Sequence, residues 1–191
     1  MRACGVVVSH ALDINTKRWG YIANTTMNEE IKTRKKNRLY NYDYGRTGIY
    51  FLTLCTKERR NYFWGDLTKE TMHIGDIELS EYGKIVDETI RRISKIYPAL
   101  SVRHYVIMPD HVHLLLRIHP DEYGRPMVAP TVSRVVQQFK GVVTKQIGRS
   151  IWQKLYYDHV IRNQKDYDEH KAYIYNNPRT WYVKQMKSTC K

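Results

Sequence analysis

Residues 106–116 read Val-Ile-Met-Pro-Asp-His-Val-His-Leu-Leu-Leu, in which a Pro-Asp pair separates two runs of strand-forming residues. Proline and aspartate favour tight turns, whereas β-branched, aromatic and other apolar residues on either side favour strands. The pattern predicts a strand over residues 100–108, a turn at Pro109-Asp110 and a second strand over residues 111–118. We therefore expect a β-hairpin at the centre of the fold.

The second strand of this hairpin begins with two histidines that are two residues apart. Because side chains alternate along a strand, His111 and His113 are expected on one face and Val112 on the other, against the core. Neutral imidazoles bind divalent metals, so the pair offers two nitrogen ligands. Spacing alone is weak evidence, since a His-x-His pair in a basic protein is more often structural.

Hydrophobic periodicity places five further elements around the hairpin. They are a strand at residues 49–55, a helix at 79–97, a helix at 131–147, a strand at 152–161 and a helix at 165–176. The resulting order β-α-β-β-α-β-α predicts an α+β fold. It is the ferredoxin-like split βαβ sandwich, an antiparallel sheet with helices on one face, plus an added C-terminal helix.

Local signals set the ends of these helices. Ser80 is a suitable N-cap for the first helix, and Gly148 is a suitable C-cap for the second. Asn177-Pro178 is expected to end the third, because proline lacks the amide hydrogen that a helix needs.

The chain has 191 residues and is 42% hydrophobic, which favours one domain with a real core. Residues 39–191 form that domain, and residues 1–38 are expected to be a basic, flexible N-terminal arm, within which Met27 is an alternative start. Three widely spaced cysteines argue against a disulfide framework and a zinc knuckle. No apolar run approaches the ~20 residues of a membrane span, and no leader is evident. We expect a cytoplasmic protein, associated with the nucleoid if it binds DNA.

The net charge of +13 favours a polyanionic partner, most often nucleic acid. Tyr62 and Trp64 are candidates to stack on unpaired bases, whereas Trp152 is expected in the core. The basic residues expected to contact the DNA backbone are Lys35, Lys36, Arg38, Arg59, Arg60, Lys140 and Lys145.

The last predicted helix carries Tyr173 and Asn177, which are four residues apart and therefore share a face. If this helix lies across the sheet near His111 and His113, a phenol and an amide oxygen would join the two imidazoles. The alternative is that Tyr173 packs the helix and Asn177 merely precedes its end.

Five blocks in order resemble the REP-associated tyrosine transposases, a branch of the HUH single-tyrosine insertion-sequence transposases. The resemblance covers most of the chain, from about residue 44 to residue 181. The blocks are residues 50–56, 106–113, 139–140, 152–163 and 173–178.

The resemblance implies a metal-dependent single-strand DNA endonuclease and transposase. His111 and His113 would be the HUH metal ligands, Asn177 a third ligand and Tyr173 the nucleophile. Phosphodiester transesterification at repeat hairpins would pass through a 5′-phosphotyrosine link. The metal would be Mg²⁺ or Mn²⁺, although imidazole ligands suit zinc better and make manganese the easier choice. Asp110 departs from the family, which commonly has asparagine there.

The partners that the resemblance implies are single-stranded or hairpin DNA, bound by a monomer or a homodimer, with no membrane association. Two other functions stay open. One is a non-catalytic nucleic-acid-binding protein that retains the fold, and the other is a zinc hydrolase of a small substrate. The high positive charge and the lack of an acidic general base near the histidines count against the hydrolase.

Overall fold

The computed structural model describes residues 46–65, 77–120 and 131–189, so the predicted arm 1–38, with Met27, lies outside the described residues. The elements are β1 (Gly48–Cys55), a short 3-10 helix η1 (Lys57–Arg59), α1 (Glu81–Ile96), β2 (Leu100–Met108), β3 (His111–Ile118), α2 (Val132–Ile147), β4 (Tyr157–Ile161) and α3 (Gln164–Thr189). Their order is the predicted one.

The strands form one sheet in the order β2-β3-β1-β4, and each neighbouring pair is antiparallel. Met108 pairs with His111 across the two-residue turn, as the hairpin prediction required. The next strand of the sheet is distant in sequence, since β3 pairs with β1 from Gly48↔Ile118 to Cys55↔His111. This order confirms the ferredoxin-like split βαβ arrangement.

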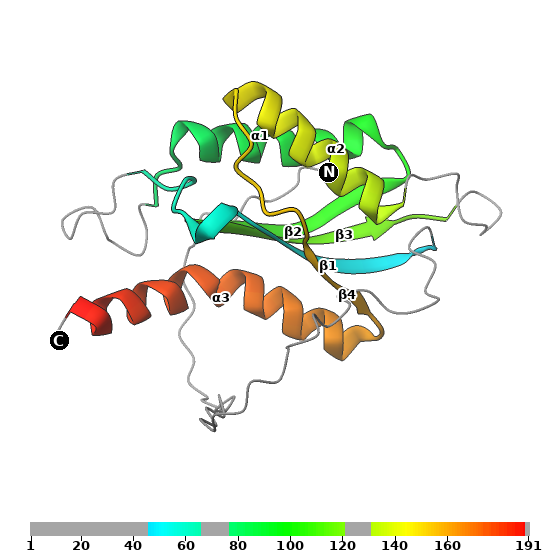
Figure 1. The fold of residues 1–191 in the computed structure, drawn as a ribbon. Coiled ribbons are helices and arrows are strands. Elements are labelled where there is room, and N and C mark those ends of the chain that lie inside the picture. The colour runs from blue at the N-terminus through cyan, green and yellow to red at the C-terminus, as the bar shows by residue number, and fades with distance from the viewer. Residues whose placement is uncertain (1–45, 66–76, 121–130, 190–191) are drawn as a thin grey trace, which may run out of the picture.

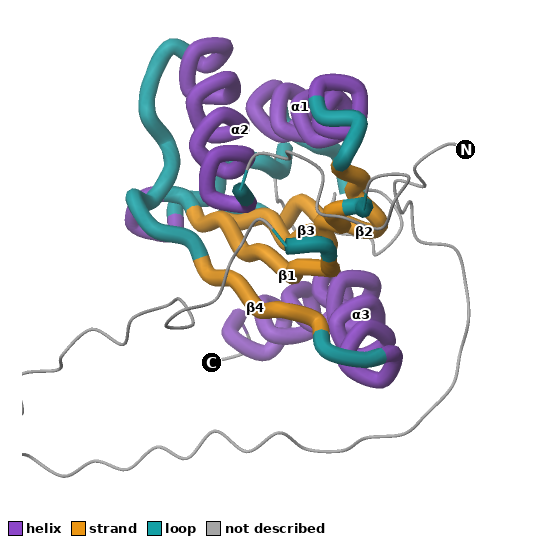
Figure 2. Tube along the Cα trace, turned by 90° about the vertical axis from the view of Figure 1, so that its right-hand side faces the viewer, coloured by secondary structure: helices purple, strands orange, loops and turns teal. Residues whose placement is uncertain are grey.

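Helices α1 and α2 cover one face of the sheet, and α3 covers the other (Figures 1 and 2). The side chains of β3 divide between these faces in the expected alternation. Val112 and Leu114 belong to the large core under α1 and α2, whereas Leu115 packs with Phe51 and Ile174 on the α3 side. The face that carries His111 and His113 is therefore the one that α3 covers.

The predicted helix caps are present. The side chain of Ser80 accepts a hydrogen bond of 3.1 Å from the Gly83 amide, which satisfies a free donor at the start of α1. Gly148 ends α2 in the left-handed region at φ 79°, where a residue without Cβ is favoured.

The predicted strand over residues 152–161 is wrong in its first half. Trp152 forms an isolated bridge with Thr56, and regular pairing begins only at Tyr157. The carbonyls of Gln153 and Leu155 instead accept hydrogen bonds of 2.8 and 3.2 Å from the Lys140 ammonium. The Gln153 amide still donates to the Cys55 carbonyl at 2.9 Å, so the Lys140 side chain supplements a short backbone contact with the end of β1.

The prediction that the last helix ends at Asn177-Pro178 is also wrong, because α3 continues to Thr189 with Pro178 inside it. Pro178 is buried, and one turn later the Trp181 ring packs against Trp64 at 5.0 Å between ring centroids. This contact stabilises the continuation against the loss of one helical hydrogen bond at proline. Within the described residues, no helix is long and apolar enough to cross a membrane.

Candidate active site

The two predicted ligands lie side by side where β3 begins. The rings of His111 and His113 meet edge to face, with centroids 4.5 Å apart. Both residues are almost fully buried, at 8% and 4% exposure. Buried polar rings require hydrogen-bond partners or ligands, so the atoms around each nitrogen determine what the pair can do.

One nitrogen of His113 has a partner and the other has none. Its Nδ1 lies 2.8 Å from the Thr53 hydroxyl on β1, the residue that pairs with it across the sheet. Its Nε2 is buried and has no hydrogen-bond partner. Burial lowers the pKa of His113 to about 2, and the positive charges of His111, Arg59 and His170 act in the same direction. His113 is therefore neutral, as a metal ligand must be.

His111 is oriented by the residue that precedes it. Its Nδ1 lies 2.5 Å from the Asp110 carboxylate, which also forms a 2.9 Å ion pair with Arg59. Burial raises the pKa of Asp110, but His111 and Arg59 together outweigh burial and lower it overall. A carboxylate on Nδ1 directs the Nε2 of the ring outward as an acceptor, the arrangement found behind metal-bound histidines.

The turn before the histidines is held by the segment after β1. The Pro109 carbonyl accepts hydrogen bonds from the amides of Tyr62 and Phe63, at 2.8 and 3.1 Å. The Asp110 carbonyl accepts from the Thr56 amide at 2.9 Å and from its hydroxyl at 3.0 Å. Three backbone amides thus fix a turn of two residues and, with it, the start of β3, while the single proton of the Thr56 hydroxyl is shared between the carbonyls of Asp110 and Arg60.

Tyr173 lies directly beside this pair. Its ring meets the His113 ring edge to face at 5.1 Å between centroids, and the Phe51 ring at 6.0 Å. The residue remains 51% exposed. The structure thus brings the predicted nucleophile and a predicted ligand into contact and leaves the phenol accessible to a substrate.

Asn177 follows Tyr173 by one turn of α3. Its amide nitrogen is buried and has no hydrogen-bond partner. The nitrogen and oxygen of an amide exchange places by a half-turn of the side chain. In the turned orientation an unpartnered carbonyl oxygen would occupy this buried position, and such an oxygen suits a cation.

The first half of α3 is anchored to β2 by a histidine that the sequence analysis did not identify. Both ring nitrogens of His104 form hydrogen bonds. Its Nε2 lies 3.0 Å from the Tyr167 hydroxyl, and its Nδ1 lies 3.2 Å from the Tyr175 hydroxyl. Burial lowers the pKa of His104, with Lys171 and Arg103 adding to the effect. Tyr175 and Tyr167 thus fasten to β2 the helix that carries Tyr173, the predicted nucleophile.

Thr53 and Phe51 were also missed as site residues. Phe51 stacks on His113 at 5.1 Å and contacts His170 at 4.7 Å. Both residues lie on β1, sixty residues before the histidines. Only the strand register brings them to the site, and a strand-forming pattern alone does not reveal it.

The residues predicted to contact DNA differ in exposure and in the partners that they bind. Arg59 is half exposed beside Asp110, and Arg60 is exposed and paired with Glu58 at 2.6 Å. Trp64 is 7% exposed and donates to the Ile107 carbonyl at 2.7 Å, so its predicted role in base stacking is wrong. Trp152 is buried, as expected, and Tyr62 is half-buried.

The two described lysines that were predicted to contact DNA also differ in exposure and in their partners. The Lys140 ammonium is bound to two backbone carbonyls, and burial lowers its pKa to about 8. Lys145 is exposed on α2. Lys35, Lys36 and Arg38 lie outside the described residues.

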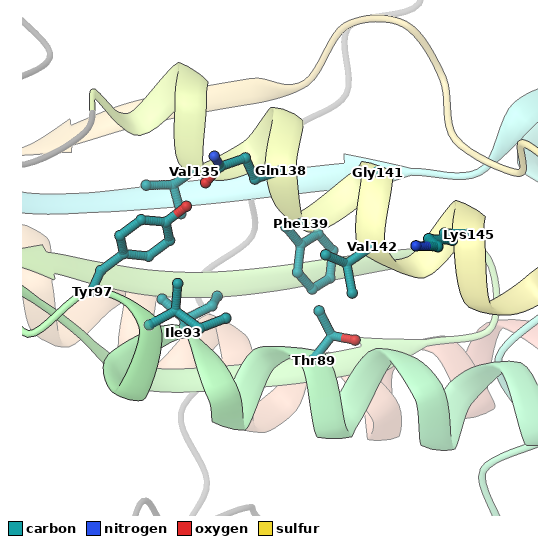
Figure 3. A pocket seen from close by; sticks show the side chains of 10 residues that line it. Thr89, Ile93, Tyr97, Val135, Gln138, Phe139, Gly141, Val142 and Lys145 are labelled. Atoms are coloured by element: carbon teal, nitrogen blue, oxygen red, sulfur yellow. The ribbon is translucent and has the colours of Figure 1, made fainter.

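A separate hollow of about 400 Å³ lies between α1 and α2 (Figure 3). Its lining is mainly apolar and includes Ile93, Val135 and Phe139, with Lys145 at one end. These helices cover the face of the sheet opposite α3 (Figure 2), so this hollow is not part of the histidine–tyrosine site.

Comparison with known proteins gives the same family as the residue pattern. The family model described as "Transposase IS200 like" matches residues 46–177. The chain belongs to this family. The match begins just before β1 and ends within α3 at Asn177, so it includes the two histidines, Tyr173 and Asn177.

Individual relatives confirm the resemblance to REP-associated tyrosine transposases. The REP-associated tyrosine transposase of Escherichia coli is 26% identical over 149 residues, which are 77% of this chain and 76% of the relative. An uncharacterized protein of Haemophilus influenzae is 29% identical over 181 residues, which are 85% of this chain and 97% of the relative.

A solved structure supports the fold. A REP-associated tyrosine transposase bound to a REP hairpin superposes with a TM-score of 0.52 at 24% identity, over 75% of this chain and 73% of that one. The likeness confirms the α+β architecture of an antiparallel sheet with a C-terminal helix.

Proposed function

We propose that this IS200-like transposase is a metal-dependent single-strand DNA transesterase, which cleaves and rejoins DNA at repeat hairpins through a 5′-phosphotyrosine intermediate. Tyr173 is the nucleophile, and His111, His113 and Asn177 hold the metal. The observation that carries the proposal is the contact between the half-exposed Tyr173 ring and the His113 ring, whose buried Nε2 has no protein partner.

The donor set fits a divalent cation. His113 is neutral with a free Nε2, and Asp110 holds the Nδ1 of His111 so that its Nε2 faces away. Asn177 adds an amide group that has no partner on its buried nitrogen. Two nitrogen ligands and one oxygen ligand suit Mn²⁺ better than Mg²⁺. A bound cation would polarise the scissile phosphate and stabilise the negative charge that develops on its oxygens.

The chemistry of the chain's own residues follows from the geometry. The Tyr173 oxygen attacks phosphorus, the bond from phosphorus to the 3′ oxygen breaks, and the phenol proton is balanced by protonation of the leaving 3′ oxygen. The products are a 5′-phosphotyrosine and a free 3′-OH. Because one phosphodiester replaces another, a second 3′-OH can reverse the step and join a new strand without an external energy source.

The DNA partner is proposed to be a hairpin with unpaired bases at its foot. Two observations support it: the net charge of +13, and the REP hairpin bound by the structurally similar transposase. Arg59, which pairs with Asp110, and the exposed Arg60 after β1 are proposed to contact the backbone of the strand to be cut. A monomer or a homodimer, acting at the nucleoid in the cytoplasm, is part of the same proposal.

The test is covalent attachment of DNA. Wild-type protein is incubated with Mn²⁺ and hairpin oligonucleotides taken from repeats that flank the gene, and adducts are resolved on a denaturing gel. Tyr173→Phe should abolish the adduct and leave DNA binding within about twofold. Tyr157→Phe is the matched control, because Tyr157 is also 51% exposed but lies on β4, and it should form the adduct normally.

Two outcomes would contradict the proposal. An adduct that persists in Tyr173→Phe would assign the nucleophile to another tyrosine. Hairpin binding by the wild type without any adduct, across several repeats and metals, would instead favour the non-catalytic binding protein.

A further inference from the structure

A second group of ligand-type side chains lies where β4 meets the start of α3. It consists of His159 on β4 and of Asp166 and His170 on α3. One ligand atom from each residue lies within 4.8 Å of the other two. None of these residues belongs to the nucleophile–ligand set that the proposed function uses.

Both imidazoles approach the same carboxylate oxygen. The His159 Nε2 and the His170 Nδ1 each lie 3.0 Å from Asp166 Oδ1. The two rings stack at 4.6 Å between centroids with only 14° between their planes. To cap the start of a helix, a carboxylate needs no contact with two imidazoles. Two imidazole nitrogens and one carboxylate oxygen that converge are the donor set of a His₂-carboxylate metal site.

The backbone explains why these groups converge. Asp166 and His170 are four residues apart and therefore share a face of α3 over one turn, the spacing that also brings together the two histidines of helical zinc motifs. The Arg162 amide donates to Asp166 Oδ2 at 2.9 Å and helps to orient the carboxylate. The His159 Nε2 lies 3.0 Å from both carboxylate oxygens, and the His170 Nδ1 also lies 2.8 Å from the Asp166 backbone carbonyl. Asn163 accepts from the Asp166 amide at 2.9 Å and caps the helix at this point.

The cluster is open to solvent but well ordered by its contacts. The side chains of His159, Asp166 and His170 are 31%, 17% and 22% exposed, so an ion can enter without opening the fold. The Phe51 ring lies between this cluster and the proposed catalytic pair, in contact with His170 at 4.7 Å and with His113 at 5.1 Å. The two groups are therefore neighbours separated by one aromatic ring.

We propose that His159, Asp166 and His170 form a second metal site, selective for zinc-type cations over magnesium. Two imidazoles and one carboxylate match the ligand preference of Zn²⁺, and the exposed side leaves a fourth position for water. A bound ion would join β4 to the first turns of α3, three residues before Tyr173. The site stands on its own geometry and does not depend on the proposed transesterase activity.

The test measures Zn²⁺ binding to the full chain by competition with a chromophoric chelator. The background is His111→Ala/His113→Ala, which removes the other imidazole pair. This protein should still bind zinc, and adding His159→Gln/His170→Gln should weaken that binding at least tenfold. The matched control adds His119→Gln, because the His119 ring lies beyond β3 and its Nε2 is 2.8 Å from the Ser101 hydroxyl, and it should leave the affinity unchanged.

A second measurement uses the unaltered protein, so that a variant that fails to fold does not decide the matter. Zn²⁺ is titrated into the wild type and the histidine ring resonances are followed by NMR. The signals of His159 and His170 should shift together with those of the catalytic pair. Zinc affinity that is insensitive to His159→Gln/His170→Gln, or resonances of His159 and His170 that do not respond to zinc, would overturn the proposal.

Discussion

The two faces of the sheet differ in what they bury. The face under α1 and α2 is covered by a large apolar cluster that includes Leu52, Leu54, Leu114 and Leu116. On the face under α3, the fully apolar cluster consists of Phe51, Leu115 and Ile174. Ile49, Val106 and Ile161 pack against this small cluster, and histidines, tyrosines and a threonine lie beside it.

Alternation along single strands produces this difference. Leu52 and Leu54 of β1 point to one side, whereas Phe51 and Thr53 point to the other, and β3 divides in the same way. The apolar face supplies free energy of folding through burial. The other face can then hold polar groups without protein partners, such as the Nε2 of His113. The apolar core that stabilises the fold and the polar groups of the candidate site thus lie on opposite faces of the same sheet.

The strongest test of this division is a cavity on the apolar face. Leu116 is fully buried, and Leu116→Ala should lower the free energy of unfolding by about 2–5 kcal/mol, measured by urea denaturation. Leu155→Ala is the control, since Leu155 is 53% exposed and should cost far less. Adduct formation per folded molecule should be unchanged in both. A similar loss in both variants would show that this face is not the main source of stability.

A smaller effect is expected from one hydroxyl on the α3 face. Thr53→Val preserves shape but removes the hydrogen bond to His113 Nδ1. Because partners behind a ligand histidine tune its affinity, the Mn²⁺ concentration for half-maximal adduct formation should rise about 10–100-fold, with little change in urea stability.

The matched control for that variant is Thr89→Val. Thr89 is also buried, but its hydroxyl donates within α1, to the Ile85 carbonyl at 2.7 Å. It should leave the Mn²⁺ dependence unaltered. An equal response in both threonine variants would mean that Thr53 does not act through His113.

The smallest predicted effect concerns a charge on the apolar side. Burial lowers the pKa of Lys140 to about 8 from the usual 10.5. Between these values the unfolded chain holds a proton that the folded protein has released, so the free energy of unfolding should rise with pH. Compared with Lys140→Met, the wild type should gain stability from about pH 8 toward pH 10 in thermal melts. Lys145→Met, at an exposed lysine, should show no such change, and a falling difference for Lys140 would contradict this sign.

The sequence predicted the fold because the relevant signals are local. Pro109-Asp110, Ser80 and Gly148 act within a few residues, and each determines a turn or a helix end as expected. Local patterns placed His111 with His113 and Tyr173 with Asn177, but only the family resemblance implied that the two pairs meet, as the contact between Tyr173 and His113 shows.

The errors arise where distant contacts outweigh local rules. Pro178 should end a helix, but packing of Trp181 on Trp64 extends it. Thr53 meets His113 only through the register of the strands, and His104 meets Tyr167 only through the docking of α3 on β2. No short sequence pattern encodes either contact. The charge of Lys140 did not reveal that its ammonium binds two carbonyls of an irregular segment, and its contact with DNA stays a prediction.

Pro178 has a further consequence for the helix that carries Tyr173. Since proline has no amide hydrogen, the carbonyl of Ile174 lacks its usual donor one turn later. The hydrogen-bonded backbone of α3 is thereby divided just after Asn177. Amide exchange should report two segments with separate protection: one fastened by Tyr167 and Tyr175 to β2, and one fastened by Trp181 to Trp64. Tyr173 belongs to the first segment, so its position is governed by β2 and not by the contact of Trp181 with Trp64.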